Sequence, residues 1–177
     1  SAFTPENLRQ FDAVLFASTT QLAFEDLNLR QSLMEFVKSG KGIIGIHAAT
    51  DNFYNWPEAG DMMGGHFDGH PWQANGTWAI KITDPTHPLN AAFANKNFQV
   101  SDEIYRIRPR GLRQNARVLV ALDMADKTNR AAPGTLFSDR DVPISWVRDF
   151  GKGRLFCSSF GHNHGIFWNP AMLRHFL

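Results

Sequence analysis

The sequence predicts an α/β protein with a mostly parallel central sheet, and three stretches near its start carry this prediction. Residues 11–19 (FDAVLFAST) and 42–48 (GIIGIHA) contain near-continuous apolar runs of strand length, which are typical of strands covered on both faces. Between them, residues 25–39 place Leu29, Leu33 and Phe36 on one apolar helix stripe. A strand, a helix and a second strand of this length match the right-handed crossover that joins parallel strands.

Capping and turn residues predict the next elements in chain order. Thr4 and Pro5 begin a short helix, and Gly40 ends the helix over residues 25–39. Residues 53–72 are rich in glycine, proline and aromatics, which predicts an ordered loop with a short helix near residues 58–63.

Apolar runs and turn signals predict the second half of the chain. The predicted segments are strands over 77–83, 100–107 and 117–122, a turn over 84–89, a hairpin over 142–162 and a final helix over 170–177. The hairpin turns at residues 151–153. The strands over 77–83 and 100–107 alternate in polarity, so we expect each to bury one face.

Composition predicts one globular domain over residues 1–177. Hydrophobic residues make up 43% of the 177 residues, and 18 Lys+Arg balance 17 Asp+Glu, which argues against a nucleic-acid or membrane-surface partner. The densest basic run is expected to be a solvated face, and its members are Arg106, Arg108, Arg110, Arg113 and Arg117. No stretch reads as a signal peptide or membrane span. The chain begins with neither Met nor a leader and stops within a helix, so we expect truncation at both ends.

Polar side chains follow three of the predicted strands. Thr20 follows the first, His47 and Asp51 follow the second, and His162 and Asn163 follow the strand that closes the hairpin. Ligands of open α/β sheets bind outside the carboxyl ends of parallel strands. If these strands are parallel neighbours, His47 and His162 approach each other across one crevice.

The loop GGHFDGHPW and the segment SDEIYR add further polar candidates. Glycine and proline break any helix around His66 and His70, so this is not the metalloprotease pattern, although either imidazole can turn toward His47. Asp102 and Glu103 alternate on a predicted strand, so we expect one to face inward and the other outward.

Covalent catalysis is disfavoured, and metal or acid–base chemistry remains. Cys157 lies in an apolar run as a buried, inert thiol, and no G-x-S-x-G elbow occurs. Imidazole and carboxylate are zinc ligands and proton shuttles. The candidate catalytic residues are His47, Glu103, His162 and Asp51, with Asp68, Asp102 and His66 as alternates. The candidate ligands of a divalent cation, zinc or manganese, are His47, His70 and His162. The alternative for each is a histidine that only makes hydrogen bonds to the backbone.

Aromatic side chains in the Gly/Pro-rich loops suggest a sugar-binding surface. Trp56 and Trp72 are candidate stacking platforms for a sugar ring, with Thr20 and Asn163 as polar substrate contacts at the strand ends. Core packing explains the same tryptophans nearly as well.

Six motifs occur in an order that resembles the trehalose-utilisation (ThuA-like) family. They are GKGIIGIHAATD, FDGHPW, DPTHP, DEIY, WVRDFGKGRLF and SSFGHN, and they span nearly the whole chain. The resemblance implies a flavodoxin-like, class I glutamine-amidotransferase-like three-layer sandwich, in which a first strand and helix precede the present segment. Related amidotransferases carry a cysteine where this chain has His47 and Ala48, so the resemblance excludes a cysteine-dependent glutaminase.

The resemblance also implies a bacterial protein of sugar catabolism, in a family associated with disaccharides oxidised to 3-keto-glycosides. The leading hypothesis is an enzyme that eliminates or isomerises such a carbohydrate, with His47 or Glu103 as base and a cation, or His162 and His70, stabilising the enediolate. The alternative is a non-catalytic carbohydrate-binding or scaffold module of a larger multidomain protein, and an amidotransferase relic is a disfavoured third. Fusion to other domains, oligomerisation, and a periplasmic, secreted or cytoplasmic location all stay open.

Overall fold

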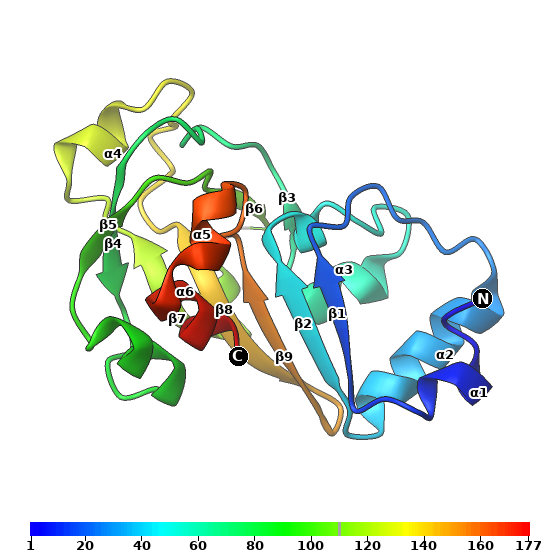
Figure 1. Cartoon of the computed structure of the whole chain (residues 1–177). Helices are drawn as coiled ribbons and strands as arrows, with labels where there is room; N and C mark the ends of the chain where they lie inside the picture. Colours follow the sequence, from blue (N-terminus) through cyan, green and yellow to red (C-terminus); the bar gives the residue numbers. More distant parts are fainter. Residues whose placement is uncertain (110) are drawn as a thin grey trace.

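A seven-stranded mixed sheet forms the centre of the computed structural model, which describes residues 1–109 and 111–177 (Figure 1). The strands of this sheet lie in the order β1-β2-β9-β8-β7-β4-β5. Their bounds are Ala13–Ala17 (β1), Gly42–Ile46 (β2), Trp78–Ile82 (β4), Phe98–Val100 (β5), Arg117–Leu122 (β7), Pro143–Phe150 (β8) and Gly153–Ser158 (β9). A separate antiparallel pair joins β3 (His66–Phe67) to β6 (Ile107–Arg108).

The helices are short except for one that follows β1. The α-helices are α1 (Pro5–Leu8), α2 (Leu27–Lys38), α3 (Pro57–Met63), α4 (Lys127–Ala131), α5 (His164–Trp168) and α6 (Pro170–Phe176). The 3₁₀ helices are η1 (His47–Thr50), η2 (Pro88–Phe93) and η3 (Leu112–Gln114). Thr4 caps α1, as predicted, and α2, α3 and α6 lie within or next to the predicted ranges. Nothing among these helices has the length and apolarity of a membrane span.

The parallel part of the sheet is the strand–helix–strand unit expected from the sequence, extended by one further strand. β1 pairs with β2, and β2 pairs with β9, both in parallel. The remaining pairs, from β9–β8 through β4–β5, are antiparallel. The predicted α/β class is confirmed as a mixed sheet with a parallel core, and the predicted hairpin is β8–β9.

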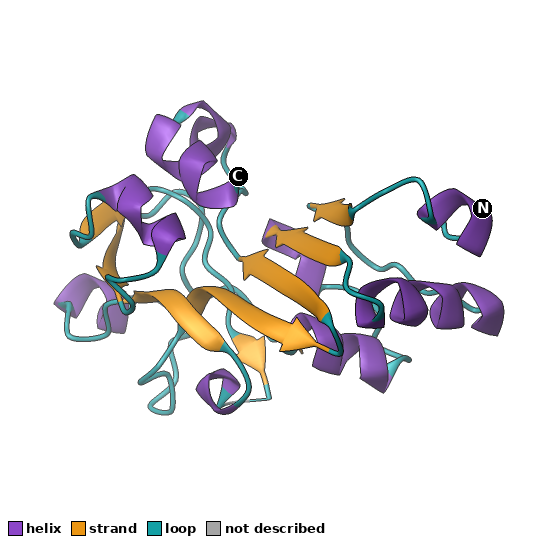
Figure 2. Cartoon of the chain, turned by 90° about the horizontal axis from the view of Figure 1, so that it is seen from below, coloured by secondary structure: helices purple, strands orange, loops and turns teal. Residues whose placement is uncertain are grey.

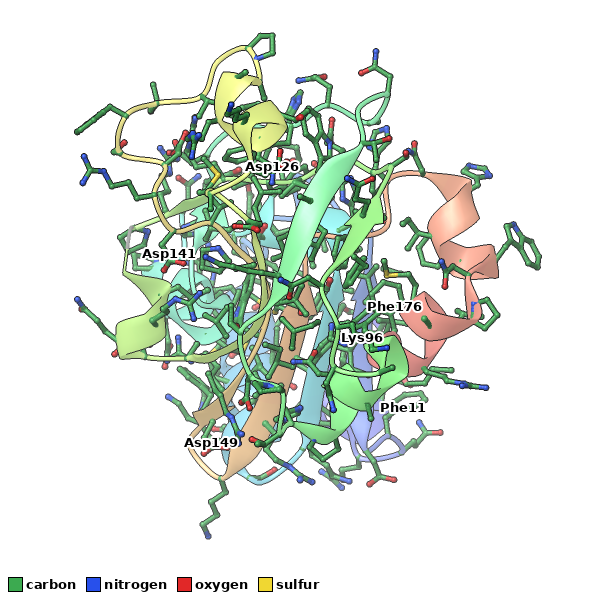
Figure 3. The ribbon with its side chains drawn as sticks, turned by 90° about the vertical axis from the view of Figure 1, so that its left-hand side faces the viewer. Phe11, Lys96, Asp126, Asp141, Asp149 and Phe176 are labelled. Atoms are coloured by element: carbon green, nitrogen blue, oxygen red, sulfur yellow. The ribbon has the colours of Figure 1, made fainter. Side chains whose placement is uncertain are left out.

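Helices cover both faces of the sheet (Figure 2). The buried apolar residues form two clusters, one on each face. The first cluster, which includes Leu33 and Phe36 of α2 and Met62 of α3, packs against one face. The second, which includes Met172 and Phe176 of α6, packs against the other. In Figure 3, Asp126 at the start of α4 lies at the top and Asp149 near the end of β8 lies at the bottom, toward opposite ends of the strands.

One face of strand β1 is largely exposed, which corrects the prediction that both of its faces are covered. Phe16 is 2% exposed and packs toward α2, whereas Leu15 on the opposite face is 56% exposed. An apolar run predicts a strand, but it does not record whether a neighbouring element covers the second face.

The predicted strand over residues 100–107 is wrong, because regular pairing stops at Val100 and resumes only at Ile107. Asp102 and Glu103 lie between these ends, and both are buried instead of alternating. The irregular backbone allows successive carboxylates to point inward, where each finds hydrogen-bond donors.

Arg106 corrects the expected solvated basic face. Its guanidinium is buried and forms a two-pronged ion pair with Asp139, with Nε–Oδ1 at 2.9 Å and Nη2–Oδ2 at 2.6 Å. Arg113 and Arg117 do pair at the surface, with Asp141 and Asp84. Arg110 lies outside the described residues.

The burial of His175 is expected to make the free energy of unfolding depend on pH. Its ring is fully buried, its Nδ1–H donates to the Leu89 carbonyl at 3.1 Å, and the Ser145 hydroxyl donates to its Nε2 at 2.8 Å. Burial lowers the pKa of His175 from 6.5 to about 4. The unfolded chain therefore binds a proton at His175 more readily than the folded chain does. The stability that the neutral His175 contributes is fully present above the pKa of the unfolded chain, and it is lost as pH falls toward the pKa of the folded chain. From pH 7 to pH 4 we expect about 3 kcal/mol of lost stability from this group.

Urea unfolding of the wild type and His175→Gln at pH 7 and pH 4 checks this expectation. The variant should be less stable at pH 7 but should lose less stability on acidification. Equal losses for both proteins would show that His175 does not drive the acid sensitivity.

Candidate active site

His47 lies at the carboxyl end of β2, where the strand passes directly into η1. Its backbone φ of +52° is unusual for a non-glycine residue and turns the side chain over the sheet edge. Its Nδ1 lies 2.9 Å from the Ser159 carbonyl, which only accepts, so Nδ1 carries the proton. Burial lowers the pKa of His47, which leaves a neutral ring whose Nε2 presents a lone pair.

His162 reaches the same point from the loop after β9, as predicted. Its Nδ1 lies 3.2 Å from His47 Nε2, and the two ring centroids are 5.1 Å apart. His47 is 6% exposed and His162 45%, so the first forms the floor of the site and the second its rim. The convergence of two imidazoles 115 residues apart follows from the parallel pairing of β2 with β9.

Glu103 joins the two imidazoles from the irregular segment before β6. Its Oε2 lies 3.6 Å from His47 Nε2 and 3.3 Å from His162 Nδ1. Its Oε1 lies 3.2 Å from Nδ1 of His70, whose side chain is 44% exposed. Gln73 Nε2 donates to the His70 carbonyl and lies 3.0 Å from the same ring nitrogen. The carboxylate therefore holds a buried imidazole and two solvent-facing ones around itself.

The three residues His47, Glu103 and His162, here termed the His–Glu–His cluster, fit a divalent cation. One ligand atom from each lies within 4.8 Å of the others. Two imidazoles and a carboxylate suit zinc and related transition metals. The bond from His47 Nδ1–H to a backbone carbonyl is the outer contact that fixes a ligating imidazole. Of the predicted ligands His47, His70 and His162, the cluster contains His47 and His162, whereas His70 contacts the other oxygen of Glu103.

Tyr105 is a site residue that the sequence reasoning missed. Its hydroxyl lies 3.1 Å from His47 Nε2, and its ring packs 4.6 Å from the His47 ring and 4.5 Å from Phe67. Burial, followed by the nearby Glu103 carboxylate, raises the pKa of Tyr105, so the phenol stays protonated at neutral pH. No regular spacing marks Tyr105 in the sequence, because the segment that carries it is not a regular strand.

Asp102 is a structural support and does not line the cluster as an acid or base. Its carboxylate accepts the backbone N–H groups of Gly161 at 2.7 Å and Asn163 at 2.8 Å, which fixes the turn that carries His162. Burial raises the pKa of Asp102, and these N–H groups oppose the shift. The Asn163 side chain donates to the carbonyls of Ala74 and Ser101, so the predicted substrate contact is occupied in holding the loop.

Asp51 and Thr20 form a second polar group near the same edge. The Asp51 carboxylate accepts from the Thr20 and Tyr54 hydroxyls and from Gln21 Nε2. Among the described residues, it makes no hydrogen bond to His47 or His162. Of the alternates, His66 stacks on Tyr54 with centroids 5.1 Å apart, and Asp68 lies near Arg108.

The two predicted sugar platforms, Trp56 and Trp72, are core residues. Trp72 is fully buried and donates from Nε1 to the Asn129 carbonyl at 2.9 Å. Trp56 is 6% exposed and packs against Phe53 and Phe24. Neither offers a ring face to a ligand. Cys157 is buried as predicted, and burial raises the pKa of its thiol to about 12, which disfavours the thiolate that a nucleophile needs.

Comparisons with solved structures identify the fold. A putative ThuA-like protein from Bacteroides uniformis is similar with a TM-score of 0.74 and 21% identity, over 98% of this chain and 71% of that one. One from Parabacteroides merdae has a TM-score of 0.70 and 16% identity, over 96% and 70%. A β-galactosidase from Bacillus circulans sp. alkalophilus matches with a TM-score of 0.57 and 12% identity, over 95% of this chain but 22% of that one. At these identities the likeness shows the fold alone.

Comparisons of sequence identify the family. A search among curated proteins found no match. The family model ThuA, described as trehalose utilisation, matches residues 1–177, which confirms the resemblance expected from the six motifs. The chain therefore belongs to the ThuA family, and that family indicates a role in sugar utilisation.

Proposed function

We propose that the His–Glu–His cluster is the catalytic centre of an enzyme that cleaves or isomerises a 3-keto-glycoside. The observation that carries this proposal is the convergence of two imidazoles and one carboxylate within 4.8 Å, with His47 oriented by a backbone carbonyl. Two imidazoles and a carboxylate suit a cation that stabilises negative charge developing on a substrate oxygen. The ThuA family suggests that this substrate is a sugar.

The chemistry follows from the acidity of a C–H bond beside a ketone. His70 is the proposed base, because its Nδ1 faces Glu103 while its side chain is 44% exposed. A buried carboxylate behind an imidazole orients the ring. We propose His70 as the base in place of His47 or Glu103, because the facing atoms of those two residues belong to the His–Glu–His cluster.

In the elimination, His70 takes the proton from C2 of a 3-keto sugar. The C–H electron pair forms the C1=C2 double bond, the C1–O glycosidic bond breaks, and the departing oxygen takes a proton. The products are an unsaturated keto sugar and a free sugar. Isomerisation shares the first step and returns the proton to a different carbon. His47, Glu103 and His162 would hold a divalent cation, which would stabilise the ketone oxygen electrostatically as its charge grows.

Proton exchange and product release test this function directly. The protein, analysed for bound metal, is incubated in D2O with 3-keto-trehalose or with trehalose, and C2 deuteration and released glucose are followed by NMR. We expect turnover of the keto sugar only, with a loss of about 100-fold or more for Glu103→Gln, which keeps the shape but removes the charge.

Other outcomes would favour different functions. Equal cleavage of trehalose would contradict the ketone-dependent mechanism and point to hydrolysis. Metal binding or sugar binding without exchange or cleavage would favour the non-catalytic module.

A further inference from the structure

The Nε2 atom of His47 has one lone pair and more neighbours than one lone pair can serve. The Tyr105 hydroxyl lies at 3.1 Å, His162 Nδ1 at 3.2 Å and Glu103 Oε2 at 3.6 Å. Because Nδ1–H donates to Ser159, the neutral ring can only accept at Nε2.

Without a cation, one arrangement of protons satisfies His47 Nε2 and both oxygens of Glu103. The Tyr105 hydroxyl donates to His47 Nε2, and His162 Nδ1–H donates to Glu103 Oε2 at 3.3 Å. His70 Nδ1–H donates to Glu103 Oε1 at 3.2 Å. Each lone pair that faces the centre of the cluster is then occupied by a hydrogen.

A cation requires the same lone pairs. Coordination by His47 Nε2 excludes the hydrogen bond from Tyr105, because one lone pair cannot serve both. The Tyr105 ring cannot simply leave, since it is 7% exposed and packed between His47 and Phe67. Its O–H therefore stays beside the cluster and must find a new acceptor.

We propose that cation binding releases the Tyr105 hydroxyl from His47 and makes it the proton donor to the substrate. This inference rests on the proposed function. With the ketone oxygen of the substrate at the cluster, the freed O–H would lie beside the bound sugar and would donate its proton to the departing glycosidic oxygen. Reprotonation from the His70 imidazolium, through water or product, restores both groups and balances the cycle.

Metal affinity tests the competition without reference to activity. Zn²⁺ dissociation constants are measured by chelator competition for the wild type, Tyr105→Phe and Tyr54→Phe. Tyr54 is the matched control because it is the other tyrosine of the chain and donates to Asp51. Removing a competing hydrogen bond should tighten Zn²⁺ binding about 5-fold in Tyr105→Phe and leave Tyr54→Phe unchanged. Unchanged affinity in Tyr105→Phe would overturn the inference, and weaker binding would overturn it by making Tyr105 a ligand.

A second readout follows the hydroxyl itself. With tyrosine labelled at ¹³Cζ, the two signals are assigned by the two variants, and Zn²⁺ should shift only the Tyr105 signal. On 3-keto-trehalose, Zn²⁺-loaded Tyr105→Phe should lose about 100-fold in kcat with KM within about 3-fold. Full activity in Tyr105→Phe overturns the donor role while leaving the proposed function intact. If the wild type neither binds Zn²⁺ nor turns over the keto sugar, the proposed function is overturned, and this inference is overturned with it.

Discussion

Replacement of His47 by asparagine is expected to abolish tight metal binding and to lower kcat/KM on a 3-keto-glycoside by about 1,000-fold or more. The imidazole supplies one of three ligand atoms, and loss of even an outer contact to a metal ligand costs 10–100-fold in affinity. Asparagine is the sharper choice than alanine because it tolerates the positive φ of residue 47. The fold should therefore persist while the chemistry is lost.

His164→Asn is the matched control for this experiment. His164 is an exposed imidazole two residues after His162, at the start of α5. Metal content by mass spectrometry, kcat/KM and circular dichroism are compared for the two variants. Metal retained at wild-type stoichiometry in His47→Asn would remove that residue from the ligand set.

Replacement of Asp139 by alanine is expected to destabilise the protein by about 3–5 kcal/mol, which lowers Tm by roughly 10 °C. The Asp139 side chain is fully buried and accepts from Arg106 through two hydrogen bonds. It also accepts the Leu136 backbone N–H at 2.8 Å. Alanine leaves a buried guanidinium without its carboxylate, which is the costly way to break an ion pair.

Asp141→Ala provides the control two residues away. Asp141, labelled in Figure 3, forms a similar two-pronged pair with Arg113 at 2.7 and 2.9 Å, but both side chains are more than a third exposed. Exposed pairs contribute about 0–1 kcal/mol. Urea unfolding of both variants measures the difference, and similar losses would contradict a stabilising role for burial of the Arg106 pair.

Local signals in the sequence were sufficient for the parallel core and for the meeting of its polar strand ends. Continuous apolar runs around an amphipathic helix allow few other arrangements, and parallel neighbours bring their carboxyl ends to one edge. The approach of His47 and His162 follows from that topology alone. Their chemical roles stay predictions.

The misplaced residues depend on packing between distant segments. Trp72 and Trp56 lie in Gly/Pro-rich stretches that resemble exposed loops, yet contacts with distant residues such as Asn129 and Phe24 enclose them. Arg106 reads as one of an alternating basic run, and its burial depends on Asp139, which lies 33 residues away. Sequence spacing cannot show such partners.

Irregular backbone explains the errors at the site itself. The segment between Val100 and Ile107 has the composition of a strand but not its pairing, so the period of two does not apply. Asp102, Glu103 and Tyr105 all enter the interior as a result. The expectation that only one of Asp102 and Glu103 faces inward was the consequence of assuming regular alternation.

The position of His47 between the two core clusters affects how the protein should tolerate heat. Ile46 belongs to one packed layer, and Ala48 and Ala49 belong to the other. Close-packed interiors transmit small displacements, so a slight slip of one layer against the other moves the ring relative to its partners. Catalytic competence would then fade on warming before secondary structure melts, and the working temperature range would be narrower than the range in which the chain stays folded.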